Sequence, residues 1–278
     1  FEGDQGLEHK VRTTCANGEV YEYQGDKGSE RLVRRTIRNG HLRYVKDYEG
    51  DKGCERMVRL TYPDGGVSEF EGDAGAERVV RARLSDGRVH EFQGDKGLER
   101  LVRETFPDGA VHEYEGDSGS ERKVRVMCVD GKVLEYEGDR GSERKVRMKF
   151  TCGRVYEYKG DKGYERLVKV TWPWNEVVEF EGTKGSERKV GVTWHTGVKE
   201  YCGNRGRERL VQVTLPDGQV EQYEGAKGSE RKVRVTTRFG IIKEYEGDKG
   251  SERMVRVIFP DGRTDEYIAH SDIHINAS

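Results

Sequence analysis

A string close to aromatic-Glu-Gly-Asp-Lys-Gly-Ser-Glu-Arg recurs along the whole 278-residue chain. Successive copies begin 22 residues apart, except for one spacing of 25 and one of 21. Such a period predicts one supersecondary unit that is stacked many times. We therefore expect a single continuous array over residues 1–267, followed by a cap or tail over residues 268–278. The twelve copies are marked by their first glycines, which are Gly3, Gly25, Gly50, Gly72, Gly94, Gly116, Gly138, Gly160, Gly182, Gly203, Gly225 and Gly247.

The composition limits how such a unit can bury its apolar residues. Charged residues make up 37% of the chain and hydrophobic ones 33%, whereas ordinary domains hold about 25% and about 45–50%. The core must therefore be thin. No apolar run approaches the ~20 residues of a membrane-spanning helix, and a formal net charge of −2 supplies no positive field for nucleic acid. We expect neither membrane insertion nor nucleic-acid binding.

Two turn signals divide each repeat into two strands. Pro-Asp-Gly or a related sequence, as at residues 107–109, is typical of a tight β-hairpin, because Asp, Asn and Gly tolerate turn dihedral angles. The Gly-Asp-Lys-Gly segment, as at residues 25–28, requires a wider loop. The pattern predicts an all-β fold, an elongated array of about twelve 22-residue β-hairpins in a twisted or curled antiparallel meander. A β-helix solenoid with one rung per repeat is the alternative.

Alternation of apolar and polar residues within the second strand predicts one buried and one solvent-exposed face. A valine never varies across the repeats, and alternation places Val168, Val170 and Trp172 on the same buried face. We interpret the aromatic residue of the first strand as core packing between hairpins, with stacking of sugars or bases as the alternative. This aromatic column comprises Tyr23, Tyr48, Phe70, Phe92, Tyr114, Tyr136, Tyr158, Phe180, Tyr201, Tyr223, Tyr245 and Tyr267.

The Tyr-Glu-Gly start, the period and the Asp-Gly turn resemble the MORN repeat family. The matching segments include Tyr48-Glu49-Gly50 and Tyr114-Glu115-Gly116, with turn glycines such as Gly109. MORN units carry Gly-x-Gly after the loop, where this chain has Glu-Arg-Lys-Val-Arg. The resemblance implies successive β-hairpins and a scaffold or interaction role. The stretch from Leu101 to Gly109 also looks like bacterial Tyr-Asp (RHS-type) repeats, which are hairpin arrays that build shells around cargo; its loop is about three residues longer than that pattern.

The acidic loops offer carboxylates of the kind that bind calcium, for example Asp26 and Glu30. The alternative is that Glu30 pairs with Arg31 and Arg34 and that Asp26 caps the turn. Three successive repeats keep the glutamate but replace the aspartate, by Thr183, Asn204 and Ala226. We therefore predict structural loops without a metal or cofactor, and interpret the Glu-Arg columns as a networked ladder.

Histidines and cysteines indicate no metal or disulfide framework. His90 and His112 occupy the same position in adjacent repeats, about 10 Å apart across two strand spacings, too far to share a metal. His270, Asp272 and His274 alternate along the tail and form a candidate metal site, with a polar tail end as the alternative. The five cysteines lie at unrelated positions in the repeat, which favours an intracellular reducing compartment. They are Cys15, Cys54, Cys128, Cys152 and Cys202.

The array loses its regularity over residues 172–212, where we expect any specific partner to dock. The candidate docking residues are Trp172, Trp174, Trp194, Arg205 and Arg207. Earlier in the chain, a three-residue insertion near residues 44–47 predicts a bulge or a longer turn. The chain begins within a repeat at Phe1, which favours a processed or trimmed N-terminus.

Repetition of one surface argues against catalysis, which needs a single asymmetric arrangement of groups. No nucleophile elbow, phosphate loop or zinc-protease motif is present, so we expect no catalytic residues and no enzyme. The leading interpretation is a non-enzymatic scaffold that presents an extended mixed-charge surface to other proteins. The alternatives are a structural subunit that assembles with itself end to end through its edge strands, forming filaments or shells, and a calcium- or glycan-binding surface protein.

Overall fold

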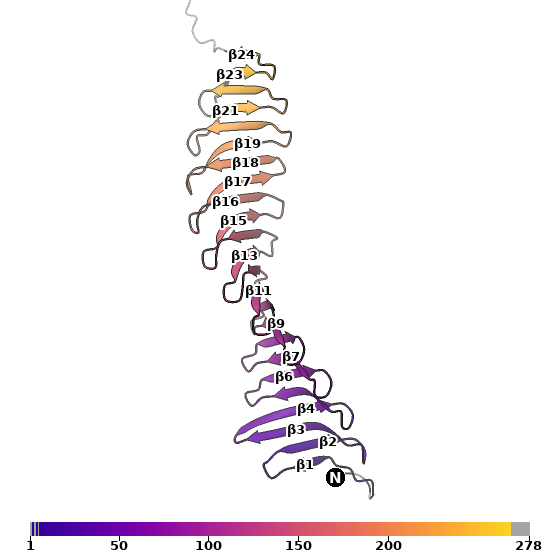
Figure 1. The fold of residues 1–278 in the computed structure, drawn as a ribbon. Coiled ribbons are helices and arrows are strands. Elements are labelled where there is room, and N and C mark those ends of the chain that lie inside the picture. Colours follow the sequence, from indigo (N-terminus) through magenta and orange to yellow (C-terminus); the bar gives the residue numbers. More distant parts are fainter. Residues whose placement is uncertain (1, 3, 5, 268–278) are drawn as a thin grey trace, which may run out of the picture. The chain divides into compact units, whose positions relative to one another are not determined.

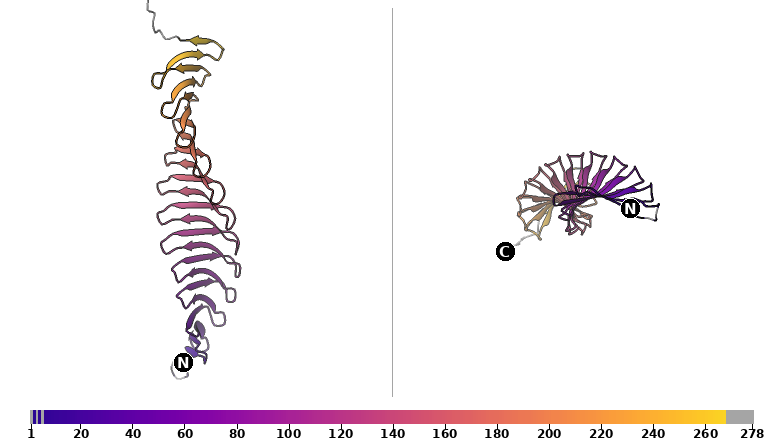
Figure 2. Two further views of the ribbon diagram at one scale, coloured as in Figure 1. Left: turned by 90° about the vertical axis from the view of Figure 1, so that its left-hand side faces the viewer. Right: turned by 90° about the horizontal axis from the view of Figure 1, so that it is seen from below.

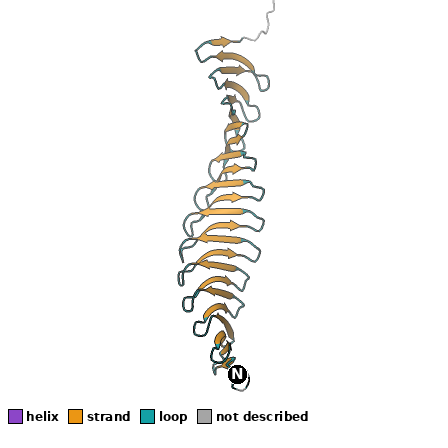
Figure 3. Cartoon of the chain, turned by 90° about the vertical axis from the view of Figure 1, so that its right-hand side faces the viewer, coloured by secondary structure: helices purple, strands orange, loops and turns teal. Residues whose placement is uncertain are grey.

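The computed structural model describes residue 2, residue 4 and residues 6–267. These residues form 24 β-strands and no helix (Figures 1 and 3). The chain divides into two compact units, Phe1–Glu143 and Arg144–Ser278, each with twelve strands. The same repeat builds both units. The prediction of one continuous array stays a prediction, and its proposed tail lies outside the described residues.

Strands of six or more residues alternate with shorter ones through most of each unit. The first unit contains β1 (Arg12–Thr14), β2 (Val20–Gln24), β3 (Arg31–Asn39), β4 (Leu42–Glu49), β5 (Arg56–Thr61), β6 (Val67–Glu71), β7 (Arg78–Arg83), β8 (Val89–Gln93), β9 (Arg100–Thr105), β10 (Val111–Glu115), β11 (Arg122–Met127) and β12 (Val133–Glu137). The second contains β13 (Arg144–Lys149), β14 (Val155–Lys159), β15 (Arg166–Thr171), β16 (Val177–Glu181), β17 (Arg188–Trp194), β18 (Gly197–Cys202), β19 (Arg209–Thr214), β20 (Val220–Glu224), β21 (Arg231–Thr236), β22 (Ile242–Glu246), β23 (Arg253–Ile258) and β24 (Thr264–Glu266).

Each unit is an antiparallel meander in a single layer. Consecutive strands pair, as β9 does with β10 and β10 with β11, and within a unit a strand contacts only its neighbours in sequence. Figure 2 shows the strands of a unit side by side and progressively rotated, as expected from sheet twist. The all-β hairpin meander predicted from the sequence is confirmed, and the β-helix alternative is wrong, because parallel rungs would pair every second strand.

The tight turns follow from the Asp-Gly signal. In the turn between β9 and β10, the Phe106 N–H donates to Ala110 C=O at 2.9 Å and the Gly109 N–H to Phe106 C=O at 2.9 Å. Gly109 has φ +93°, a conformation that costs glycine nothing. In the turn between β15 and β16, Asn175 takes this position with φ +65°, and asparagine is among the residues that best tolerate it. We call the side of each sheet that carries these turns the turn edge.

The three-residue insertion forms no bulge or longer turn, contrary to expectation. It lengthens β3 to nine residues and β4 to eight, and the two strands meet at the pair Asn39–Leu42 around a two-residue turn. Added residues on both sides of a turn extend the ladder by further cross-strand hydrogen bonds, whereas a bulge would leave one residue unpaired.

A bulge occurs instead at the invariant valine. Between β10 and β11, Glu113 pairs with Arg125 but Tyr114 pairs with Lys123, so Val124 is the extra residue. The same register shift recurs in other pairs of strands joined by a wide loop, such as β14–β15 and β22–β23. A bulge breaks the two-residue alternation of side chains.

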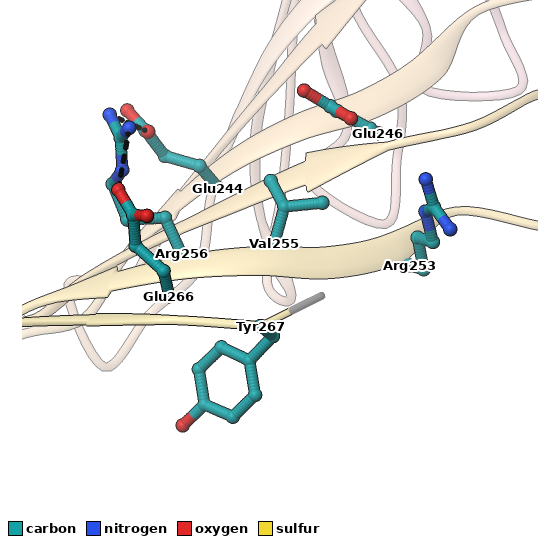
Figure 4. A pocket seen from close by; sticks show the side chains of 7 residues that line it. All are labelled: Glu244, Glu246, Arg253, Val255, Arg256, Glu266 and Tyr267. Atoms are coloured by element: carbon teal, nitrogen blue, oxygen red, sulfur yellow. Dashed lines mark hydrogen bonds and ion pairs between the residues drawn. The ribbon is translucent and has the colours of Figure 1, made fainter. Parts of the chain in front are cut away.

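The bulge corrects the predicted burial pattern. Val255 points to the same side of the sheet as Glu246 and Arg253, whereas Tyr267 points to the opposite side (Figure 4). The invariant valine therefore does not share the face of the residue two positions later. We call the side with these Glu and Arg side chains the charged face, and the side with the aromatic column the aromatic face.

Most of the core is a row of valines on the aromatic face, whereas Val111 lies on the charged face with Glu113. The buried apolar side chains of the described residues are Val111 and a column of six valines, and no large side chain is fully buried. The aromatic column, apart from the exposed Tyr267, is half-buried beside this row, because no second layer covers it within a unit. The column of six buried valines comprises Val126, Val170, Val192, Val213, Val235 and Val257.

Candidate functional site

The wide loops close on their own backbone and side chains. In the loop between β2 and β3, the Ser29 N–H donates to Asp26 C=O at 2.9 Å. The Glu30 carboxylate then accepts from the Gly28 N–H at 3.0 Å and from the Lys10 N–H of the preceding repeat at 3.3 Å. The predicted pairing of Glu30 with Arg31 and Arg34 is therefore wrong. It failed because the loop brings the carboxylate over backbone N–H groups, while Arg34 bonds Asp47 at 2.7 Å.

Lysines and arginines link these loops to one another. The Lys52 ammonium donates to Gly28 C=O of the preceding loop at 2.8 Å, and Arg56 donates to Gly72 C=O of the following loop at 3.3 Å. The same two bonds recur in both units, for example from Lys249 to Gly228 at 2.8 Å and from Arg231 to Gly247 at 3.4 Å. We call this continuous set of loop-to-loop bonds within a unit the loop-edge ladder.

The carboxylates of the loop glutamates accept hydrogen bonds from backbone N–H groups within the loop-edge ladder. The Leu32 N–H and other backbone N–H donors lower the pKa of Glu55, so its carboxylate stays ionised as both oxygens accept hydrogen bonds. Calcium requires about six to eight oxygen ligands, and would have to displace these donors. No group of three or more His, Cys, Asp or Glu among the described residues is arranged to hold a metal ion.

We expect Glu55→Ala to lower the free energy of unfolding by about 2 kcal/mol, because two backbone N–H groups lose a charged acceptor. Glu49→Ala in the same repeat should cost less than about 0.5 kcal/mol, since that 64% exposed side chain only pairs with Arg56 at the surface. Urea unfolding followed by circular dichroism measures both. Equal effects of the two substitutions would contradict the role given to Glu55.

The charged face is a ladder of alternating carboxylates and guanidinium groups. At the end of the second unit, Arg256 lies between Glu244 and Glu266, with contacts of 3.4 and 3.1 Å (Figure 4). Similar pairs cross between neighbouring strands in the first unit, such as Arg122–Glu115 at 3.2 Å. The charges of this face thus neutralise one another locally, which leaves a mixed surface of no strong sign.

On the aromatic face, lysines lie over the tyrosine rings. The Lys145 ammonium is 3.8 Å from the centre of the Tyr158 ring, and the Lys189 ammonium is 3.6 Å from that of Tyr201. Burial lowers the pKa of both lysines. Each cation is therefore satisfied within the sheet by a cation–π contact.

A polar cluster interrupts the valine row in the first unit. Glu104 of β9 takes the valine position and is only 8% exposed. One carboxylate oxygen contacts Arg88 at 3.1 Å and His90 at 3.2 Å. The other accepts from the Tyr114 hydroxyl at 2.9 Å and lies 3.9 Å from His112. The two histidines are thus bridged by a carboxylate, which the analysis of the sequence missed, although a charge in an apolar column was the available signal.

Electrostatics keep this cluster ionised at its centre. Burial would raise the pKa of Glu104, but hydrogen bonds from Tyr114, His90 and Arg88 lower it overall. Burial and the nearby Lys123 lower the pKa of His112, and burial with the bond to Glu104 raises that of Tyr114. The cluster therefore holds one carboxylate with several donors, an arrangement that supports the fold around β9.

We expect Glu104→Ala to lower the free energy of unfolding by about 3 kcal/mol, because it leaves a cavity and removes the acceptor shared by Arg88 and Tyr114. Glu104→Val should cost clearly less, since it restores the residue of the buried row and fills the space. Thermal and urea unfolding of the two variants test this order. A valine variant as unstable as the alanine variant would contradict it.

The candidate docking residues fall on opposite edges of the second unit. Trp172 and Trp174 stack at one turn with ring centres 5.2 Å apart, and Trp194 ends β17 at the same turn edge. Arg205 lies in the wide loop between β18 and β19, at the opposite edge, where it donates to Gly185 C=O, and Arg207 belongs to the same loop. The five residues do not form one surface, and their role in docking stays a prediction.

The cysteines, the tail histidines and the absence of a membrane span were also addressed by the sequence. All five cysteines are free thiols. The candidate metal site of His270, Asp272 and His274 lies outside the described residues. None of the described residues belongs to a helix that is long and apolar enough to span a membrane.

Comparisons with known proteins give distant structural matches. No family model and no curated protein matches, so the resemblance to MORN repeats is not confirmed. The chain is similar to one in the crystal structure of TcdB2-TccC3, with 10% identity over 91% of this chain and 22% of that one (TM-score 0.19). A chain of TcdB2-TccC3-Cdc42 matches with 11% identity over 89% and 17% (TM-score 0.19). A chain of the Photorhabdus luminescens Tc holotoxin pore matches with 10% identity over 93% and 21% (TM-score 0.16).

This chain therefore spans about a fifth of the length of the solved chains that it matches. The class of protein is defined by the fold itself: a repeated β-hairpin meander.

Proposed function

We propose that this chain is a non-enzymatic repeat scaffold that presents the faces and edges of its sheets to other proteins. The observation that supports this proposal is the loop-edge ladder, in which the most acidic segments of the chain are engaged in holding repeats together. The charged face neutralises itself in the same way. A surface of many equivalent, internally satisfied positions suits extended protein contact more than catalysis.

A quantitative pull-down tests this function. The chain is immobilised and exposed to extract from its source, with and without an excess of the free chain as competitor. We expect particular proteins to be retained and then lost when the free chain competes. Absence of any competed protein would contradict the scaffold proposal. A calcium-dependent shift in melting temperature would favour the calcium-binding alternative instead.

Self-assembly is the second candidate function, favoured by the strand edges. Among the described residues, β1 pairs only with β2 and β24 only with β23, so each has one edge without a partner strand. Unpaired strand edges add further strands readily. Light scattering over a concentration series tests this candidate: particles that grow with concentration would place it first, and a constant mass would exclude it.

A further inference from the structure

An exposed indole lies at the turn edge of the second unit, in the turn between β15 and β16. Trp174 keeps 64% of its surface exposed, and its ring stacks on Trp172 with an angle of 18° between the planes. The Trp174 indole N–H donates to the Glu176 carboxylate at 3.0 Å. These two contacts fix the orientation of the ring before any partner arrives, which reduces the entropy lost on binding.

The two neighbouring indoles already carry cations from this chain. The Arg154 guanidinium of the preceding hairpin turn lies 4.8 Å from the centre of the Trp172 ring. The Lys199 ammonium lies 4.6 Å from that of Trp194. A cation held over an indole face is attracted by the ring quadrupole, and tryptophan is the best of the aromatic residues for this contact. Trp174 has no such cation among the described residues.

Glu176 also has no cation in direct contact; Lys189 interacts with it only through longer-range electrostatics. Its hydrogen bond from Trp174 is accompanied by no ion pair with any described Lys, Arg or His. Glu19, which occupies the same position after the turn in an earlier repeat, pairs with Arg35 at 2.9 Å. An exposed indole and a carboxylate without an ion pair among the described residues, hydrogen-bonded to each other, thus lie side by side at this turn.

We propose that Trp174 and Glu176 form a receptor for an arginine side chain of a partner protein. The guanidinium stacks on the indole and donates to the Glu176 carboxylate. Arginine fits better than lysine, because its planar group stacks on a ring while its N–H groups reach a carboxylate. This inference rests on the proposed scaffold function and gives it a contact point with a defined chemistry.

The indole N–H signals of Trp172, Trp174 and Trp194 provide the test by NMR, after assignment with single Trp→Phe variants. The full chain is titrated with the peptide Ac-Gly-Ser-Arg-Ser-Gly-NH2. Matched peptides carry lysine or citrulline, the uncharged analogue of arginine, in place of the arginine. We expect a saturable shift of the Trp174 signal with arginine, a weaker one with lysine and none with citrulline. Trp194 serves as the internal control, because Lys199 already covers it.

Two variants separate a charge effect from a general surface effect. Glu176→Gln should weaken arginine-peptide binding about tenfold, the loss of one charged hydrogen bond. Glu179→Gln, in the adjoining strand β16, should leave binding unchanged. A citrulline peptide that binds as well as the arginine peptide, or equal shifts at Trp194, would overturn the proposal. A Trp174 shift with maltohexaose but not with the arginine peptide would replace it by a sugar platform.

Failure of this proposal is distinguishable from failure of the scaffold function. If the arginine peptide does not bind but the pull-down still retains competed proteins, the contact point is wrong and the scaffold stands. If no protein is retained in the pull-down while the peptide binds, the site exists and the scaffold proposal is wrong.

Discussion

Gly160→Ala is expected to lower the free energy of unfolding of the second unit by about 3–5 kcal/mol. Gly160 opens the loop between β14 and β15 with φ +117°, and a Cβ there would lie 2.6 Å from the Tyr164 carbonyl oxygen. Such a backbone conformation is strained for alanine, and the contacted atom is backbone that cannot move aside without breaking the loop.

Gly163→Ala in the same loop is the matched control. Gly163 has φ +82°, but a Cβ there meets nothing within 4 Å. The expected cost is about 1–2 kcal/mol, from the left-handed conformation alone. Tryptophan fluorescence during urea unfolding reports on this unit, because Trp172, Trp174 and Trp194 all belong to it. Equal destabilisation by the two alanines would show that the close approach to Tyr164 does not matter.

Acidification below the ordinary carboxyl pKa is expected to destabilise both units. Backbone N–H donors lower the pKa of the loop glutamates, and for Glu121 and Glu165 they outweigh a burial effect of opposite sign. A carboxyl whose pKa is lower when folded contributes stability that is complete above its unfolded pKa, near 4.5, and is lost as the pH falls through the folded pKa. The affected residues are Glu30, Glu55, Glu77, Glu121, Glu165, Glu187, Glu208, Glu230 and Glu252.

Circular dichroism during a titration from neutral to acidic pH measures this effect. The triple variant Glu187→Gln, Glu208→Gln and Glu230→Gln is the control. It should be less stable at neutral pH, because amides replace three charged acceptors, and it should lose less further stability on acidification. A urea midpoint that stays constant from neutral pH to well below the ordinary carboxyl pKa would contradict the role of the loop glutamates.

The fold was predictable because its signals are local. An Asp-Gly or Asn-Gly pair in each tight turn, as at Gly109, requires a hairpin whatever lies elsewhere in the chain. The face of the invariant valine was not predictable in this way. Val124 is the extra residue of a bulge, and a bulge depends on the register of two paired strands, not on the alternation within one.

In the candidate sites, too, local features were predictable from the sequence, whereas contacts that depend on the folded structure were not. The irregular turn at Trp172 and Trp174 was visible in the sequence, and the structure stacks the two rings. The partners of Glu30 were not visible, because its carboxylate bonds backbone N–H groups whose positions only the folded loop defines. Glu104 was overlooked although it replaces an apolar residue, since its partners come from the neighbouring strands β8 and β10 and, for Arg88, from the turn before β8.

The restriction of strand contacts to neighbours in the sequence has a consequence for how each unit folds. Within each unit, a described strand contacts only the strands beside it in the chain, so each of these contacts closes a short segment. Folding rates of small proteins rise as the average sequence separation of contacting residues falls. We therefore expect each unit to fold quickly for an all-β protein, starting from any one hairpin and extending to both sides, so that early repeats can become ordered while later ones are still being synthesised.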